Sequence, residues 1–148
     1  MHLFIPTLLA LTLVGCNEEE IDPTPQDFSD CDNTGGDAYD FGTVNIDGEN
    51  DESYIEDDTL IVPVSYGGGC EDHIFVICWP EQAFLESDPV QVSLDLWHDA
   101  NGDTCEAYLS ETLEFDLTEL KESYQDAYQT EEGTILIGIG SDLLTYGF

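Results

Sequence analysis

The sequence predicts an all-β protein, a small antiparallel β-sandwich of about six to eight strands stapled by disulfide bonds. Three observations predict it. Short runs of apolar residues alternate with polar ones at a period of two, which is the spacing of a strand with one buried face. Turn-forming residues separate these runs. The chain also has five cysteines within 148 residues, a length that suits one domain with its own core.

The alternating pattern is clearest in residues 90–96. The even-numbered residues of this run are apolar and share one face, whereas the odd-numbered residues are polar and share the other. This is the pattern of a strand that packs one side against a core. Six runs have strand character: residues 39–46, 59–66, 73–79, 90–98, 105–115 and 134–140. The closing residues 143–148 are predicted to form a last strand that pairs back on residues 134–139.

Only residues 117–128 have a helical pattern. Leu120, Tyr124 and Tyr128 recur along one side of this segment, which is the spacing of an amphipathic helix. The sequence therefore predicts one short helical turn in an otherwise β-structured chain.

The chain begins with an apolar run, residues 1–15, that is too short to span a membrane and stands where a secretory signal belongs. The run leads into Leu13-Val14-Gly15-Cys16, which resembles the lipobox of bacterial lipoproteins. The resemblance implies that lipid, palmitate included, is attached to Cys16 and that a signal peptidase cuts just before it. Residues 1–15 are then a lipoprotein signal peptide, and the acyl chains anchor the protein in a lipid bilayer.

An acidic segment, residues 16–38, follows the signal peptide and is poor in aliphatic residues. Such a composition buries too little apolar surface to offset the entropy lost on ordering, so we expect a flexible tether. Residues 39–148 are predicted to form the sandwich domain. Asn17 and the three glutamates after it resemble lipoprotein sorting signals, and they favour an extracytoplasmic location at the outer membrane or cell surface.

The charge of the chain excludes several classes of partner. Asp and Glu number 34, Lys121 is the only Lys or Arg, and the formal net charge is −33. Nucleic acid is excluded because contact with its phosphates needs Lys and Arg. Two interpretations of the acids remain open. They form either a solvated surface that keeps an exported protein soluble or, in part, a Ca²⁺ site.

Cysteine usage predicts disulfide bonds. With Cys16 lipidated, four cysteines remain in an exported chain, so two disulfides are expected. The sequence permits three different pairings among the four. We favour Cys70 with Cys105, because each follows a Gly-containing turn next to a strand, and Cys31 with Cys78, which would pin the tether.

A zinc site is the alternative for two of these cysteines. Cys70 and His73 have C-x-x-H spacing, and His98 and Cys105 flank the next turn. Two adjacent strand ends could therefore supply Cys2His2 ligands, although oxidising conditions favour the disulfide over thiolates. The other interpretation of His73 and His98 is a structural hydrogen bond at a turn.

The DANGD turn that begins at Asp99 also has two interpretations. Asp99, Asn101 and Asp103 match the opening D-x-N-x-D of a calcium loop, which Glu106 or a neighbouring acidic turn would complete. The flanking segments are strands, unlike the helices of an EF-hand. The alternative is a hairpin whose Asn-Gly pair supplies the positive φ angles of a type I′ turn.

Two longer motifs carry a further family resemblance. YGGGCEDHIF at residues 66–75 and HDANGDTCEAYLSETLEFDL at residues 98–117 resemble a pattern in uncharacterised bacterial lipoproteins, similar to the C-terminal β-sandwich domain of NigD-like proteins. The resemblance implies a small extracytoplasmic sandwich and supplies no catalytic residues.

Common enzyme motifs are absent from the sequence. It has no G-x-S-x-G, H-E-x-x-H or P-loop motif, so we expect no catalytic activity. We expect a structural or binding module that meets a protein or glycan partner through an apolar patch near Trp79, Trp97 or Phe84. We expect no cofactor, and the alternative is a calcium-dependent binding module that uses the DANGD turn. A metallohydrolase built on His73 and His98 is the third interpretation.

Overall fold

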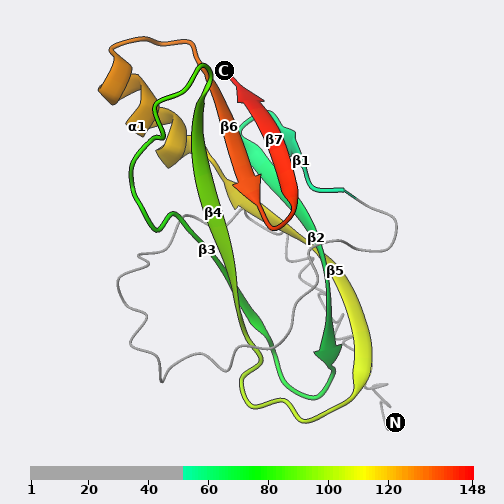
Figure 1. Cartoon of the computed structure of the whole chain (residues 1–148). Helices are drawn as coiled ribbons and strands as arrows, with labels where there is room; N and C mark the ends of the chain where they lie inside the picture. The colour runs from blue at the N-terminus through cyan, green and yellow to red at the C-terminus, as the bar shows by residue number, and fades with distance from the viewer. Residues whose placement is uncertain (1–51) are drawn as a thin grey trace, which may run out of the picture.

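A computed structural model describes residues 52–148, which form two β-sheets and one helix (Figure 1). The elements are β1 Tyr54–Glu56, β2 Thr59–Gly68, β3 Ile74–Cys78, β4 Val90–Asp99, β5 Ala107–Asp116, α1 Thr118–Tyr128, β6 Thr134–Ile139 and β7 Asp142–Gly147. One sheet has the order β1-β2-β5, and the other has the order β3-β4-β6-β7. The prediction of an all-β sandwich with one short helix is confirmed.

Strand pairing is antiparallel with one exception. β2 pairs with β5 along its whole length, from Thr59 opposite Asp116 to Gly68 opposite Ala107, and β7 pairs back on β6 as predicted. β4 pairs antiparallel with β3 but parallel with β6. This differs from the fully antiparallel sandwich that the sequence predicts. A parallel pair needs a long crossover, and β5 and α1 together supply it.

The DANGD segment joins the two sheets and does not close a hairpin. Asn101 and Gly102 have positive φ angles of 51° and 71°, as a tight turn predicts. However, β4 and β5 belong to different sheets, so the predicted type I′ hairpin is wrong. The reason lies in the pairing, because β3 and β6 occupy both edges of β4 while β5 pairs with β2.

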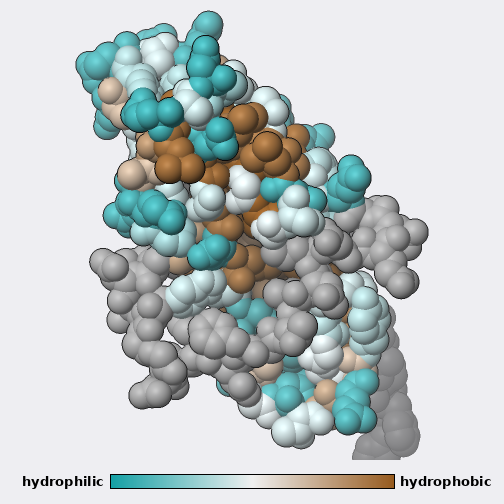
Figure 2. Space-filling model, viewed as in Figure 1, coloured by the Kyte–Doolittle hydropathy of each residue, from teal (hydrophilic) through white to brown (hydrophobic). Residues whose placement is uncertain are grey.

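The core lies between the sheets and follows the predicted alternation. Val90, Val92 and Leu94 are at most 7% exposed, whereas Ser93 and Asp95 between and beside them are exposed. Side chains alternate between the two faces of a strand, so a shift of the strand register by one residue would turn these apolar side chains to solvent. On the face seen in Figure 2, apolar residues gather over the part of the molecule where β6 and β7 lie.

Helix α1 begins at Thr118, and only Leu117 separates it from the end of β5. The Asp116 side chain accepts a hydrogen bond from the Thr118 N–H, which satisfies one of the donors left free at a helix start. Leu120 is the buried residue of the helix at 0% exposure, and Tyr124 and Tyr128 pack against the core on the predicted side. Gln129 ends the helix in the left-handed region with φ 54°.

Several sequence predictions lie outside the described residues: the signal peptide 1–15, the lipidation site Cys16, the tether 16–38, the strand 39–46 and Cys31. Within residues 52–148, β1 is a strand that sequence reasoning missed. Across the same residues, no helix has both the length and the apolar character needed to cross a bilayer.

Candidate functional site

A disulfide closes the end of the first sheet at which β2 ends and β5 begins. Cys70 and Cys105 are bonded, with their Cα atoms 5.8 Å apart, and this is the pairing that the sequence analysis favoured. The bond lies just beyond the last pair of the β2–β5 ladder. Cys78 is also disulfide-bonded, while its predicted partner, Cys31, lies outside the described residues.

Asp103 anchors the same end of the sandwich. Its Oδ2 accepts hydrogen bonds from the backbone N–H groups of residues 69–71 at 2.8–3.1 Å, and its Oδ1 accepts one from the Cys105 N–H at 2.8 Å. Its side chain is 0% exposed. The backbone N–H groups of Cys105, Cys70 and Glu71 hold the pKa of this carboxyl well below its usual range, because they favour the charged form.

Two histidines extend this network into the core. His73 Nε2 lies 3.2 Å from Asp103 Oδ2, and His73 Nδ1 lies 2.7 Å from His98 Nε2. An ionised carboxylate only accepts hydrogen bonds, so His73 donates from Nε2. A neutral His73 ring then accepts from His98 at Nδ1. The His98 ring stacks on Phe75 at 4.5 Å between centroids, and His98 is 2% exposed.

Tyr66 completes the cluster on the β2 side. Its ring centroid is 4.6 Å from that of His73, and its hydroxyl donates to Glu111 at 2.8 Å. Burial, together with the bond to Glu111, raises the pKa of Tyr66 to about 12. The hydroxyl therefore stays protonated at physiological pH and acts as a donor within the fold.

The four residues proposed as zinc ligands lie at the same end of the sandwich, but the cysteines are oxidised and the histidines are hydrogen-bonded to each other. Cys70 and Cys105 form a disulfide and offer no thiolate, while His73 and His98 bond to each other through facing nitrogens. The side chain of His73 is 2% exposed, as is His98 as a whole. The cluster therefore matches the structural interpretation of the histidines and presents no accessible ligand pair.

Asp99, Asp103 and Glu106, the three acidic residues of the calcium hypothesis, are not brought together as a ligand set. Asp99 Oδ1 accepts from the Asn101 N–H at 2.8 Å, and Asp103 is engaged with backbone donors. Within residues 52–148, the one group of three His, Cys, Asp or Glu side chains with ligand atoms mutually within 4.8 Å is Cys70, Asp103 and Cys105. Asp99, Asp103 and Glu106 do not form such a group.

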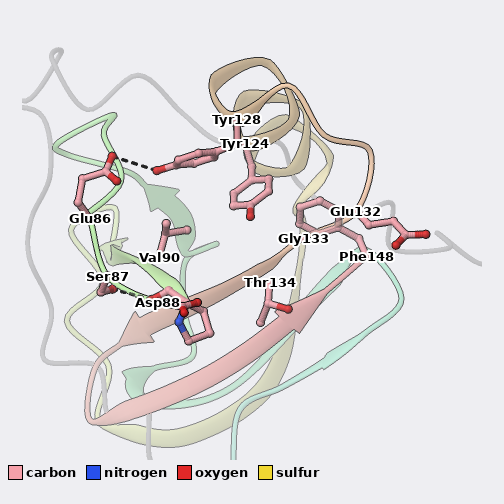
Figure 3. Close-up of a pocket in the computed structure, with 11 residues that line it drawn as sticks. Glu86, Ser87, Asp88, Val90, Tyr124, Tyr128, Glu132, Gly133, Thr134 and Phe148 are labelled. Atoms are coloured by element: carbon pink, nitrogen blue, oxygen red, sulfur yellow. Dashed lines mark hydrogen bonds between the residues drawn. The ribbon is translucent and has the colours of Figure 1, made fainter.

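A pocket of about 650 Å³ lies between α1, the turn before β4 and the start of β6 (Figure 3). Three aromatic rings, three carboxylates and smaller residues line it: Tyr124, Tyr128, Phe148, Glu86, Asp88, Glu132, Ser87, Pro89, Val90, Gly133 and Thr134. The rings are half-buried and the carboxylates are exposed. The pocket thus combines an aromatic wall with an acidic rim.

The helix and the C-terminus place the aromatic rings. Tyr124 and Tyr128 lie one turn apart on α1, with ring centroids 4.6 Å apart. Phe148 meets Tyr124 edge-on at 5.4 Å. The backbone of Gly133 exchanges two hydrogen bonds with Phe148, and a Cβ at Gly133 would lie 2.7 Å from Cζ of Tyr124. The absence of a side chain at Gly133 therefore lets Tyr124 approach the backbone.

The turn before β4 places the acidic side of the pocket. Leu85 and Gln91 exchange two backbone hydrogen bonds at 2.8 and 3.1 Å, which bring Glu86 to face α1. The Tyr128 hydroxyl donates to Glu86 at 3.1 Å, as Figure 3 shows. Burial and this bond raise the pKa of Tyr128.

Sequence reasoning found only the surroundings of this pocket. Phe84, named as part of an apolar patch, packs on Trp79 at 5.2 Å and on Tyr124 and Tyr128 at 5.8 Å. Trp79 is 9% exposed and belongs to the core. The tyrosines were recognised as one face of a helix, and the sequence gives no sign that Glu86 and Phe148 meet that face.

The fold is shared with solved structures. No model of a protein family matches the chain, and no curated protein matches it. A protein from Parabacteroides distasonis, named as toxin-related, has a TM-score of 0.51 at 18% identity, over 84% of this chain and 60% of that one. A protein from Bacteroides fragilis, named as a lipoprotein, has a TM-score of 0.53 at 11% identity, over 84% of this chain and 68% of that one.

A NigD-like immunity protein from Bacteroides caccae is also similar, with a TM-score of 0.49 at 21% identity, over 84% of this chain and 58% of that one. This score is too low to establish a shared fold. The chain spans about 60% of the length of the Parabacteroides protein. At 18% and 11% identity, the two higher-scoring similarities show that this chain shares their fold, and they show the fold alone.

Proposed function

We propose that this protein is a lipid-anchored, extracytoplasmic binding module without catalytic activity, and that the pocket beside α1 is its ligand site. The pocket carries the proposal. Its volume of about 650 Å³ falls in the range of ligand sites, and aromatic walls with a few polar groups are typical of them. The histidine cluster is closed to solvent and stabilises the opposite end of the sandwich instead.

The location rests on separate observations. The lipobox-like sequence ending in Cys16 supports an acyl anchor, and disulfides at Cys70 and Cys78 fit an exported chain. One structure with the same fold belongs to a protein named as a lipoprotein. We place the protein at the outer membrane or cell surface, with its acyl chains in the bilayer and its pocket available to a protein or glycan partner.

Mass spectrometry of the protein from host membranes tests the anchor. The expected N-terminal peptide begins at Cys16 and carries acyl chains, and Cys16→Ser moves the protein to the soluble fraction. An intact N-terminus at Met1 in the membrane fraction would contradict the anchor.

Ligand-observed NMR on the purified protein tests the pocket, with a panel of amines, saccharides and small carboxylates. Glu132→Trp fills the pocket from its rim, whereas Glu131→Trp adds the same side chain at the adjacent exposed residue, which does not line it. At least one class of compound is expected to bind wild type and Glu131→Trp but not Glu132→Trp. If no compound distinguishes the two variants, the pocket is not a binding site.

A further inference from the structure

We infer that the pocket beside α1 binds an organic cation, an ammonium or guanidinium group; this inference rests on the proposed function. The pocket's own residues carry it. Three carboxylates stand at the rim, three aromatic rings form the wall, and none of the lining residues is basic. Figure 3 shows Glu86 and Asp88 on one side of the cavity and Glu132 on the other, with the tyrosine rings between them.

The one Lys or Arg side chain of this protein is bonded elsewhere and not to the carboxylates of this rim. Lys121 is the only Lys or Arg among 148 residues, and its Nζ is bound to both carboxylate oxygens of Asp58 at 2.9 and 3.1 Å. The Tyr146 hydroxyl also donates to Asp58 at 2.6 Å. The hydrogen bond from Tyr146, and after it the one from Lys121, lowers the pKa of Asp58. Asp58 therefore stays ionised and remains bonded to Lys121. Lys121 also lies over the Phe148 ring, with its Nζ 5.6 Å from the ring centroid. The three rim carboxylates are exposed and are therefore open to solvent or to a cationic ligand.

The aromatic wall selects the kind of cation. The faces of tyrosine rings attract ammonium and guanidinium groups through the ring quadrupole, and Tyr124 and Tyr128 present two rings from one side of α1. A bare metal ion needs ligand oxygens gathered around it. Within the described residues, Glu86, Asp88 and Glu132 do not meet as such a set. A cation with its own carbon skeleton can instead span the distance between carboxylates and rings.

Two kinds of ligand carry such a cation: a partner protein, through a Lys or Arg side chain, and a free polyamine. NMR titrations of the purified protein at fixed ionic strength use three probes: a peptide with one internal Lys, spermidine, and a neutral saccharide. Tighter binding of the peptide assigns the cation to a protein partner, and tighter binding of spermidine assigns it to a free polyamine. Either result supports the inference.

Two neighbouring glutamates provide a matched pair of charge variants. Glu132→Gln and Glu131→Gln each remove one negative charge from an exposed side chain, but only Glu132 lines the pocket. Cation affinity is expected to fall about two- to five-fold in Glu132→Gln, the effect of a partly exposed ion pair, and to stay unchanged in Glu131→Gln. Tyr128→Leu, checked for folding by thermal unfolding, is expected to weaken binding several-fold through loss of a ring face.

Three outcomes would overturn the inference. Equal loss of affinity in Glu132→Gln and Glu131→Gln would mean that the protein attracts cations only through its overall charge. If the saccharide binds in the pocket and the cations do not, the proposed function stands and the cation inference fails. If Glu132→Trp affects none of the probes, both fail together.

Discussion

At the scale of single residues, the side chain of Asp103 links two segments of the chain. Its carboxylate holds the 69–71 turn, the His73 ring and the Cys105 backbone at once. Each oxygen acts only as an acceptor, which is why an ionised carboxylate suits a position where so many donors converge. The disulfide between Cys70 and Cys105 ties the same two segments covalently.

Replacing this carboxylate by an amide is expected to destabilise the domain. Asp103→Asn keeps the shape of the side chain but leaves one acceptor oxygen, so donors now bonded to the other oxygen lose their partner. The thermal midpoint is expected to drop by several degrees. Asp95→Asn, at an exposed site on β4, is the control and should leave the midpoint nearly unchanged. An equal drop in both variants would mean that the loss of stability does not come from the hydrogen bonds of Asp103.

We also expect the stability difference between wild type and Asp103→Asn to depend on pH. Asp103 has a pKa below its usual 3.8 in the folded protein, so its ionised form stabilises the folded state. That contribution is complete above the unfolded pKa and is lost as pH falls towards the lower folded pKa. The midpoint difference between wild type and Asp103→Asn should therefore narrow as pH falls from about 4 to about 2. A gap that stays constant over this range would contradict the assignment.

A substitution at Gly68 tests how tightly the cluster of His73 and His98 is packed. A Cβ at Gly68 would lie 2.6 Å from Cε1 of His73, whereas a Cβ at Gly67 would meet nothing within 4 Å. The His73 ring is held by Asp103 and His98 and has little room to shift. Denaturant unfolding should show Gly68→Ala destabilised by about 1–3 kcal/mol and Gly67→Ala changed by less than about 1 kcal/mol. Equal effects would mean that the cluster is loosely held.

At the level of elements, α1 depends on one buried side chain. Only Leu117 separates its first residue from the end of β5, and Leu120 is the only buried residue within the helix. Tyr124 and Tyr128 pack beside it and line the pocket. The placement of the pocket wall therefore depends on the packing of Leu120.

Truncation of this anchor is expected to loosen the helix and the pocket together. Leu120→Ala removes a side chain with 0% exposure and should cost about 2–5 kcal/mol. Glu122→Ala, at an exposed position of the same helix, should change stability by less than about 0.5 kcal/mol. Calorimetry measures the stability, and far-UV circular dichroism measures the helix. A fully helical Leu120→Ala protein of unchanged stability would show that another contact holds α1.

At the level of the whole molecule, the net charge of −33 governs the response to salt. Repulsion among carboxylates destabilises a compact state, and salt screens it with a Debye length of about 10 Å at 0.1 M. The thermal midpoint is therefore expected to rise with NaCl. At matched ionic strength, Ca²⁺ should give no further rise, since Asp99, Asp103 and Glu106 do not meet as ligands. A Ca²⁺-specific rise in the thermal midpoint that Asp99→Ala abolishes would instead support a calcium site at the DANGD turn.

Local patterns in the sequence determined the elements from β2 to β7, although not β1. The alternation in residues 90–96 predicted both the strand and its buried face, because consecutive side chains point to opposite sides of a strand. Spacing also predicted α1 from Leu120, Tyr124 and Tyr128, and the return of the last strand onto β6. The grouping of Cys70 with Cys105 was found in the same way, from turns next to strands.

Only the tertiary structure decided how these elements meet. DANGD is compatible with a hairpin or with a crossing between sheets, and the choice depends on β3, β6 and β2, which lie far from it in the chain. The facing nitrogens of His73 and His98 depend on the β3–β4 register. The pocket combines the turn at residues 86–89, helix α1 and the C-terminal Phe148. Such contacts arise from pairing and packing between distant segments, and local periodicity carries no record of them.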